Sequence, residues 1–241
     1  METVKFIALL FIGTGAGFIQ RVSGFGIGVF SMLFLPGLLH SPASASTVAT
    51  LFSCGTCTYN GIKYVKKVEY KTLLCLILGS LIMTPIGVRL AVITPVAIFE
   101  RVLGIILICL SIYFLFFNNR IKVKANMPTG VLIGGISGGM NGLIAIGGPP
   151  IVLYLSNALR DNDVYFATSQ LFFAFINIYA ITMRAINGIV TKDILLCALI
   201  GFIGCLIGDM IGKRVFDKLN PTRLRQIIYI GMIISGILMI V

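Results

Sequence analysis

The chain has 241 residues, of which 58% are hydrophobic and only 11% are charged, and its mean hydropathy is +1.03. This composition excludes a water-soluble globule, because too few polar residues remain to cover its surface. The formal net charge of +11 would suggest nucleic acid as a partner of a soluble protein. In a membrane protein such a charge records topology, so we expect a lipid bilayer and no nucleic acid as partner.

Ten apolar stretches of unequal length run almost from one end of the chain to the other. They cover residues 6–19, 24–39, 43–62, 73–88, 102–117, 129–143, 144–155, 164–183, 194–212 and 227–241. A helix needs about 20 residues to cross the hydrocarbon core, whereas shorter pieces are often re-entrant. We therefore predict an all-α, polytopic transmembrane helical bundle with broken or re-entrant helices. The first two stretches, and the sixth and seventh, are either hairpins that dip into the membrane or short tilted spans.

The two halves of the chain carry matching residues. Four residues of the first half align, at a constant spacing of 121, with four of the second: Gly13, Gly17, Gln20 and Gly26 with Gly134, Gly138, Asn141 and Gly147. Internal duplication explains this match. We predict a first membrane repeat over residues 1–117, a basic cytoplasmic linker over 118–126 and a second membrane repeat over 127–241.

Basic residues gather in one set of alternate loops, which predicts the orientation. That set holds Lys63, Lys66, Lys67 and Lys71, then Arg120, Lys122 and Lys124, then Arg160, then Lys213, Arg214, Lys218, Arg223 and Arg225. Because short cytoplasmic loops collect Lys and Arg, these loops should be cytoplasmic and both termini outside. Corresponding loops of the two halves then face opposite sides, as two inverted repeats of about five segments each require.

Two glycine-rich breaks lie at matching places, over residues 13–28 and 134–150. Discontinuous helices at corresponding positions of a repeated membrane protein place helix ends around a substrate. The amino-terminal ends of helices attract anions, and prolines such as Pro149 suit the first turn of a helix. The alternative is that the four-residue glycine spacing, as in Gly13 and Gly17, only lets helices pack closely.

These features give a set of candidate substrate-binding residues. The first break contributes Gln20, Arg21, Ser23, Gly24, Gly26 and Gly28, and the second contributes Asn141, Gly142, Gly147, Gly148 and Pro149; Ser169, Gln170 and Asn177 share one face of a later helix. Polar groups within a membrane are costly unless they face a cavity or a partner. The alternatives are a membrane-surface position for Arg21 and helix packing for Gln20 and Asn141.

Further polar residues have weaker claims. Asp209 is a candidate for carrying a coupling proton, with an ordinary ion pair to Lys213 as the alternative. Arg184 ends its segment and is expected to extend toward the membrane surface. Cys54 and Cys57 form a C-x-x-C pair, whose redox use would make the chain a membrane redox or assembly protein; packing thiols are the alternative. One histidine and no clustered carboxylates predict no zinc or iron site. We also expect no cofactor and no enzymatic activity.

At its two breaks the chain resembles the TauE/SafE family of sulfite and organosulfonate exporters. The segments concerned are AGFIQRVSGFGIGVFSMLFLP, residues 16–36, and SGGMNGLIAIGGPPIVLYL, residues 137–155. The resemblance implies a bacterial inner-membrane secondary transporter, expected to export small anions such as sulfite, sulfonates or related organic acids. An anion uptake permease or channel is the alternative, and assembly into a homo-oligomer is left open.

Overall fold

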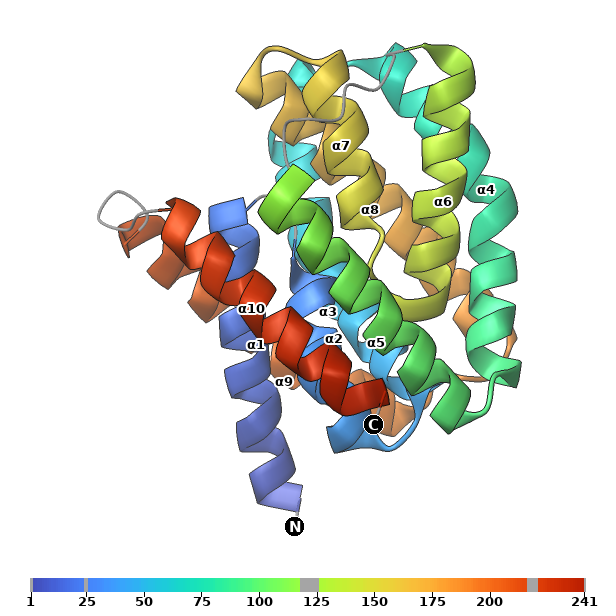
Figure 1. Cartoon of the computed structure of the whole chain (residues 1–241), viewed down its shortest axis with the longest axis vertical. Helices are drawn as coiled ribbons and strands as arrows, with labels where there is room; N and C mark the ends of the chain where they lie inside the picture. The colour runs from blue at the N-terminus through green and yellow to red at the C-terminus, as the bar shows by residue number, and fades with distance from the viewer. Residues whose placement is uncertain (1, 24–25, 118–125, 216–220, 241) are drawn as a thin grey trace.

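The computed structural model describes residues 2–23, 26–117, 126–215 and 221–240, which form helices joined by short connections (Figure 1). The α-helices are α1 (Glu2–Ser23), α2 (Ile27–Leu39), α3 (Pro42–Lys63), α4 (Tyr70–Ile93), α5 (Val96–Ile112), α6 (Met127–Ile144), α7 (Gly148–Ala158), α8 (Asn162–Ile186), α9 (Lys192–Val215) and α10 (Pro221–Ile240). A 3₁₀ turn, η1 (Val65–Lys67), follows α3, and a π-helical turn, η2 (Tyr113–Phe117), follows α5. The predicted all-α fold is confirmed.

Side-chain caps fix several helix starts. Ser41 Oγ accepts a hydrogen bond from the amide of Ser44 at the start of α3, and Asn126 Oδ1 accepts one from Thr129 at the start of α6. Both helices also have proline in their first turn, where its missing N–H costs nothing. These caps satisfy amide groups that have no partner within the helix.

Five of the described helices are long and apolar enough to cross a membrane. They contain the spans Val4–Arg21, Tyr70–Ile93, Val96–Phe116, Asn162–Ile186 and Lys192–Arg214. By contrast, α2 has 13 residues and α7 has 11. At 1.5 Å per residue these two are only about 20 and 17 Å long, less than the ~30 Å hydrocarbon core. The protein is a multi-pass membrane protein, and α2 and α7 are half-helices within it.

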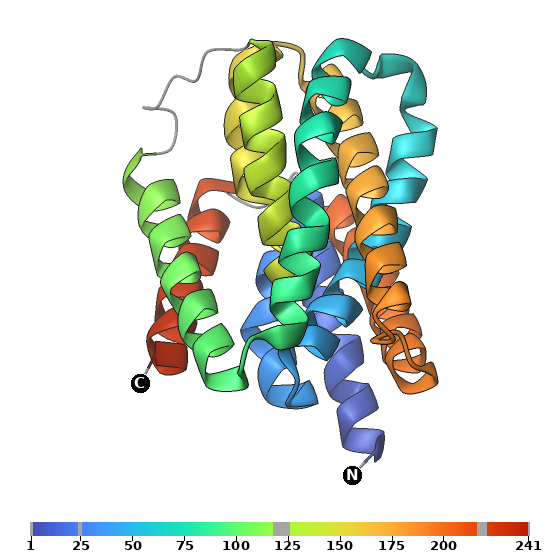
Figure 2. The same cartoon turned by 90° about the vertical axis from the view of Figure 1, so that its right-hand side faces the viewer.

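Each half-helix folds back on the helix before it. Gly15 of α1 lies against the Phe30 ring of α2, and Ser137 of α6 lies beside Gly147 at the start of α7. Figures 1 and 2 show the α1–α2 hairpin at the lower end of the molecule and the α6–α7 hairpin at the upper end, with their tips near mid-height. The helices are thus interrupted where the sequence predicted breaks, and the two hairpins point toward each other from opposite ends of the molecule.

Two helix pairs pack backbone against backbone and run parallel, α1 with α9 and α4 with α6. A Cβ atom added to Gly13 would lie 2.1 Å from the carbonyl oxygen of Gly201, and one added to Gly134 would lie 2.0 Å from that of Leu76. Only glycine permits such an approach. For these two glycines the close-packing interpretation of the sequence is correct.

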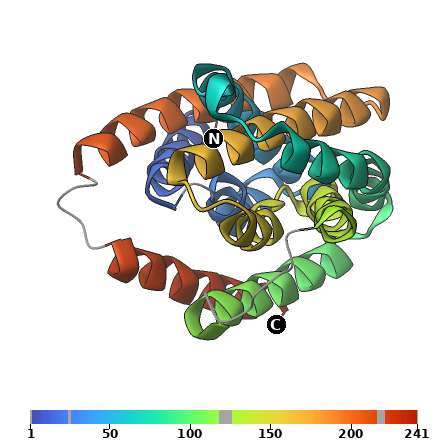
Figure 3. The same cartoon turned by 90° about the horizontal axis from the view of Figure 1, so that it is seen from above.

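The other main pairs, α3 with α8 and α5 with α10, run antiparallel. Figure 3 shows α5 and α10 side by side as an outer layer. The rings of Phe114 and Tyr229 stack between them with centroids 5.1 Å apart. If each helix of α1–α5 is matched in order with one of α6–α10, the parallel pair α1–α9 corresponds to the parallel pair α6–α4. The antiparallel pairs α3–α8 and α5–α10 each correspond to themselves.

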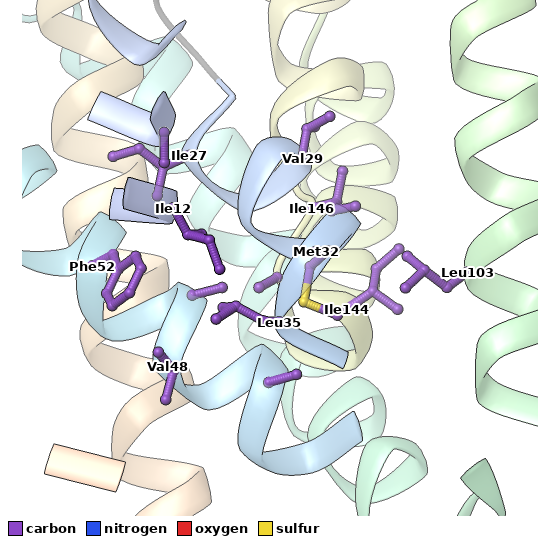
Figure 4. Packing of buried hydrophobic residues seen from close by; sticks show 14 of the residues in the cluster. Ile12, Ile27, Val29, Met32, Leu35, Val48, Phe52, Leu103, Ile144 and Ile146 are labelled. Carbon is purple, nitrogen blue, oxygen red and sulfur yellow. The ribbon is translucent and has the colours of Figure 1, made fainter. Parts of the chain in front are cut away.

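An apolar cluster ties the outer layer to the hairpin tips. Ile144 at the end of α6 lies between Met32 of α2 and Leu103 of α5 (Figure 4). Ile27 and Ile146, which flank the two breaks, belong to the same cluster and are almost fully buried. Aliphatic packing of this kind holds the tips together where the backbone is irregular.

Candidate functional site: a polar cavity between two helix breaks

The backbone at each break adopts a conformation that ends a helix. Gly26, which precedes α2, has a φ of 134°, a value that favours glycine. Ala145 ends α6 in the left-handed conformation with a φ of 58°, and its amide donates to the carbonyl of Asn141 at 3.0 Å. Pro149 and Pro150 then occupy the first turn of α7. Each break therefore exposes the amino-terminal end of a half-helix.

The two breaks meet in the interior of the protein. A Cβ atom on Gly28 would lie 1.8 Å from the carbonyl oxygen of Ala145, so α2 touches the α6–α7 connection backbone to backbone. A cavity of about 30 Å³ lies at this contact. It is lined by Gln20, Gly26, Ile27, Gly28, Val29, Ser53, Asn141, Ala145, Ile146, Gly147, Gly148 and Phe173. A water needs roughly 10–15 Å³, so this cavity suits a small ion or a few waters and excludes a bulky molecule.

Two helix starts lie at the cavity. The first amides of a helix have no partner within it and carry the positive end of the helix dipole. Ile27 N, at the start of α2, donates to Gln20 Oε1 at 3.4 Å. Gly147 and Gly148, at the start of α7, lie on the other side of the same cavity. The arrangement favours a negative guest.

An amide network joins the cavity to the surrounding helices. Asn141 Nδ2 donates to Asn177 Oδ1 at 3.1 Å, and Asn177 Nδ2 donates to Ser53 Oγ at 2.9 Å. Ser137 Oγ donates to the carbonyl of Gly147 at 2.7 Å and so holds the α6–α7 connection. All four side chains come from α3, α6 and α8, so these helices set the position of the second break.

Arg184 corrects a sequence prediction. It was expected to extend toward the membrane surface, but its side chain is 0% exposed. It donates to the carbonyls of Gly142 at 2.7 Å, Ser46 at 3.0 Å and Asn141 at 3.5 Å, and to Thr50 Oγ1. The carbonyls at the end of the broken helix α6 supply acceptors inside the membrane, and these make the inward position tolerable.

Comparison with known families decides the wider identity. The family described as "Sulfite exporter TauE/SafE" matches residues 9–239 of the chain. The chain belongs to the TauE/SafE family. This confirms the resemblance and the prediction of a membrane transporter in place of an enzyme. Comparison with curated proteins and with solved structures gave no match.

In this TauE/SafE protein the cavity contains six of the residues expected from the sequence. These are Gln20, Gly26, Gly28, Asn141, Gly147 and Gly148. Asn177 adjoins it through the amide network. Their role in substrate binding remains a prediction, but they come from both breaks and lie together.

Other candidate residues lie elsewhere. Gly142 packs on α4, where an added Cβ atom would be 2.4 Å from the carbonyl oxygen of Thr84. The Arg21 stem lies against Gly212 of α9. Ser169 Oγ donates to the carbonyl of Phe166 at 2.8 Å. None of these three lines the cavity.

The remaining candidates are also outside the cavity lining. Pro149 and Gln170 are buried on α7 and α8, and Asp209 lies on α9. Among the described residues the one ion pair is Lys67 with Asp163, so Asp209 forms none with Lys213. Ser23 ends α1, and Gly24 lies outside the described residues.

Sequence reasoning missed the polar face of α3. Ser46, Thr50, Ser53 and Cys57 recur at spacings of four, three and four residues, which places them on one side of a helix. Ser53 lines the cavity, Ser46 and Thr50 bind Arg184, and Cys57 Sγ lies 3.5 Å from Ser53 Oγ. This periodicity was the available signal. All six cysteines are free thiols.

Proposed function

We propose that this TauE/SafE protein is a secondary transporter that exports small anions, such as sulfite, sulfonates or related organic acids, and that it binds them between its two helix breaks. The observation that carries the proposal is a small cavity lined by the first residues of two half-helices and by Gln20 and Asn141. The family description, a sulfite exporter, supports the substrate class.

The chemistry of the lining favours a negative charge. Its twelve residues include no carboxylate that would repel an anion. In a membrane interior the effective dielectric constant is low, so fixed dipoles act more strongly than they would in water. The small volume of the cavity, about 30 Å³, further restricts the size of the anion that can bind.

The arrangement of the halves supports alternating access. Parallel pairs that exchange with one another, and antiparallel pairs that map onto themselves, are what two inverted repeats would give. In such transporters one repeat or bundle rocks against the other around a site near the midplane. We place the linker at 118–126, of which 118–125 lie outside the described residues, between repeats 1–117 and 127–241.

Flux into liposomes tests the proposal. Purified protein is reconstituted, and the movement of labelled sulfite is followed with and without an imposed proton gradient, beside liposomes that lack protein. We expect saturable flux that competing sulfonates inhibit and that the gradient drives. Flux that ignores every ion gradient would favour a channel, and gradient-driven entry in the cell would favour an uptake permease. Absence of saturable movement of any small anion rejects the proposal.

The redox alternative is tested in the same assay. Cys54 and Cys57 lie on α3, where their thiols contact hydroxyl groups of Thr58 and Ser53. Replacing both cysteines with serine should preserve sulfite flux if the protein is a transporter. Loss of function in this variant, with normal folding, would instead support thiol chemistry.

A further inference from the structure

Arg184 is a fully buried cation whose hydrogen-bond partners are all neutral. Its guanidinium group donates to three carbonyls and to the Thr50 hydroxyl group, and its Nε has no hydrogen-bond partner among the described residues. An arginine stays protonated in proteins. A positive charge therefore lies inside the bundle.

No carboxylate balances that charge in the part of the chain that the structure describes. Its one ion pair, Lys67 with Asp163, lies on the exposed surface. A buried charge without an opposite charge costs several kcal/mol, and ionisable residues within membrane segments are retained for function by default. The position of Arg184 therefore needs a functional reason.

Part of the charge is offset by the carboxyl-terminal end of α6. Asn141 and Gly142, whose carbonyls accept from Arg184, belong to the last turn of that helix. The end of a helix carries roughly half a negative charge, so it offsets the full charge of the arginine only in part. The same contacts hold the end of α6 in place.

The remaining charge lies next to the cavity. Asn141 accepts a hydrogen bond from the guanidinium through its backbone carbonyl oxygen, and Asn141 is one of the residues that line the cavity. Ala145, one turn further on, lines it as well. Arg184 is thus hydrogen-bonded to a residue that lines the space in which we place the substrate.

We propose that Arg184 determines the charge selectivity of the site: its uncompensated positive charge attracts small anions, while its hydrogen bonds position the end of α6. It is a positioning and selectivity residue that acts across the backbone of Asn141. This inference rests on the proposed function, since it assumes that the cavity holds the transported anion.

Thr50 allows the charge to be neutralised without removing the arginine. The Thr50 hydroxyl group accepts a hydrogen bond from Arg184, and Thr50 does not line the cavity. Thr50→Asp places a carboxylate there, and Thr50→Asn is its neutral counterpart of the same shape. We expect the KM for labelled sulfite in proteoliposomes to be about tenfold or more higher in Thr50→Asp than in Thr50→Asn, given an effective dielectric constant near 20.

The outcome separates charge from structure. If Arg184 only caps α6, the two Thr50 variants have the same KM, and the inference is overturned while wild-type flux still supports the proposed function. If wild-type protein moves no anion, the proposed function itself fails. Thermal unfolding of each purified variant checks the fold.

A second pair covers the case in which Thr50→Asp does not fold. Arg184→Lys keeps the charge and loses the planar fork, whereas Arg184→Gln loses both. We expect Arg184→Lys to keep a KM at least fivefold lower than Arg184→Gln, with both less stable than wild type. Equal KM values in this pair would overturn the inference as well.

Discussion

Amide side chains are the main polar groups at the hairpin tips. Asn141, Asn177 and Ser53 form a chain of hydrogen bonds across α6, α8 and α3. A buried amide that loses its partner leaves an unsatisfied group, at a cost of about 1–3 kcal/mol. The network therefore serves both the stability of the fold and the position of the Asn141 amide at the cavity.

Removing the Asn141 side chain should affect both properties. Asn141→Ala deletes the bond to Asn177 and one of the amides that line the cavity. We expect the KM for sulfite to rise about tenfold or more, since one hydrogen bond to a charged group is worth about 1.5–3 kcal/mol and about 1.4 kcal/mol corresponds to tenfold. Flux kinetics and thermal unfolding measure the two effects.

Asn157 of α7 offers the matched control. Its side chain is exposed and bonds only the carbonyl of Leu153 one turn earlier, at 2.8 Å. Asn157→Ala should leave the KM within about twofold of wild type, because surface substitutions usually change little. A similar KM change in both variants would contradict a specific role for Asn141.

At the scale of single elements, the half-helices depend on close backbone contact. Gly28 near the start of α2 faces the carbonyl of Ala145, whereas Gly37 near its end has no atom within 4 Å of an added Cβ. A side chain larger than hydrogen therefore has no room at position 28, at the tip of the hairpin, but has room at position 37, at the far end of the same helix.

This difference gives a paired test. Gly28→Ala would place its methyl group 1.8 Å from the Ala145 oxygen and must force the hairpins apart. We expect a loss of about 1–3 kcal/mol and of flux. Gly37→Ala should keep both, or gain up to about 1 kcal/mol from higher helix propensity. Thermal unfolding and sulfite flux distinguish them; equal behaviour would argue against contact between the tips.

The start of α8 should respond to acid. Hydrogen bonds from the amides of Val164 and Asp163 hold the pKa of the Asp161 carboxyl group below its usual range. A lowered pKa means that the stabilisation is present above the unfolded-state value, near 3.9, and is lost as the pH falls through the folded-state value. The melting temperature of the wild-type protein should therefore decrease when the pH is lowered below about 4.

Asp161→Asn separates this effect from general acid denaturation. Asparagine also caps helices, but it carries no titrating charge. The difference in melting temperature between wild type and the variant should shrink as the pH is lowered from neutral to about 3. Parallel curves over that range would show that the cap does not contribute to the acid response.

At the scale of the whole molecule, the basic turn η1 and the loop before α8 lie at one end. Lys67 pairs with Asp163, and the Glu69 amide donates to Thr168 Oγ1 at 3.0 Å, so η1 adjoins the start of α8. Tyr154 near the end of α7 donates to the carbonyl of Asn126 before α6 at 3.1 Å. Figure 1 shows these ends together at the top. We propose that this end faces the cytoplasm of the cell in which the protein occupies the inner membrane.

Cysteine labelling in intact cells tests the orientation. In a background without native cysteines, Lys66→Cys on η1 and Asn187→Cys after α8 place thiols at exposed positions near opposite ends of α8. A membrane-impermeant maleimide should label Asn187→Cys and spare Lys66→Cys until the cells are permeabilised. The reverse pattern would invert the topology, and with it the positive-inside interpretation.

The sequence by itself determined the class and much of the arrangement. Apolar stretches without polar alternation, separated by short polar loops, must form helices in a bilayer, because a helix satisfies all its backbone N–H and C=O groups internally. The positions of the breaks follow from glycine and proline. The tips of both hairpins therefore coincide with the predicted breaks. Close packing was the alternative that the glycine spacing left open, and α1 packs closely on α9 and α4 on α6.

Only the tertiary structure decided which residues meet. Arg21 and Arg184 both occur near segment ends, yet Arg21 lies against α9 while Arg184 turns inward, because the broken end of α6 offers it carbonyl acceptors. Ser53 lines the cavity because α3 packs beside both hairpin tips, where Asn177 of α8 donates to its hydroxyl group. Local pattern specifies how a segment folds, whereas its neighbours in space determine which polar group is satisfied and which is left for a ligand.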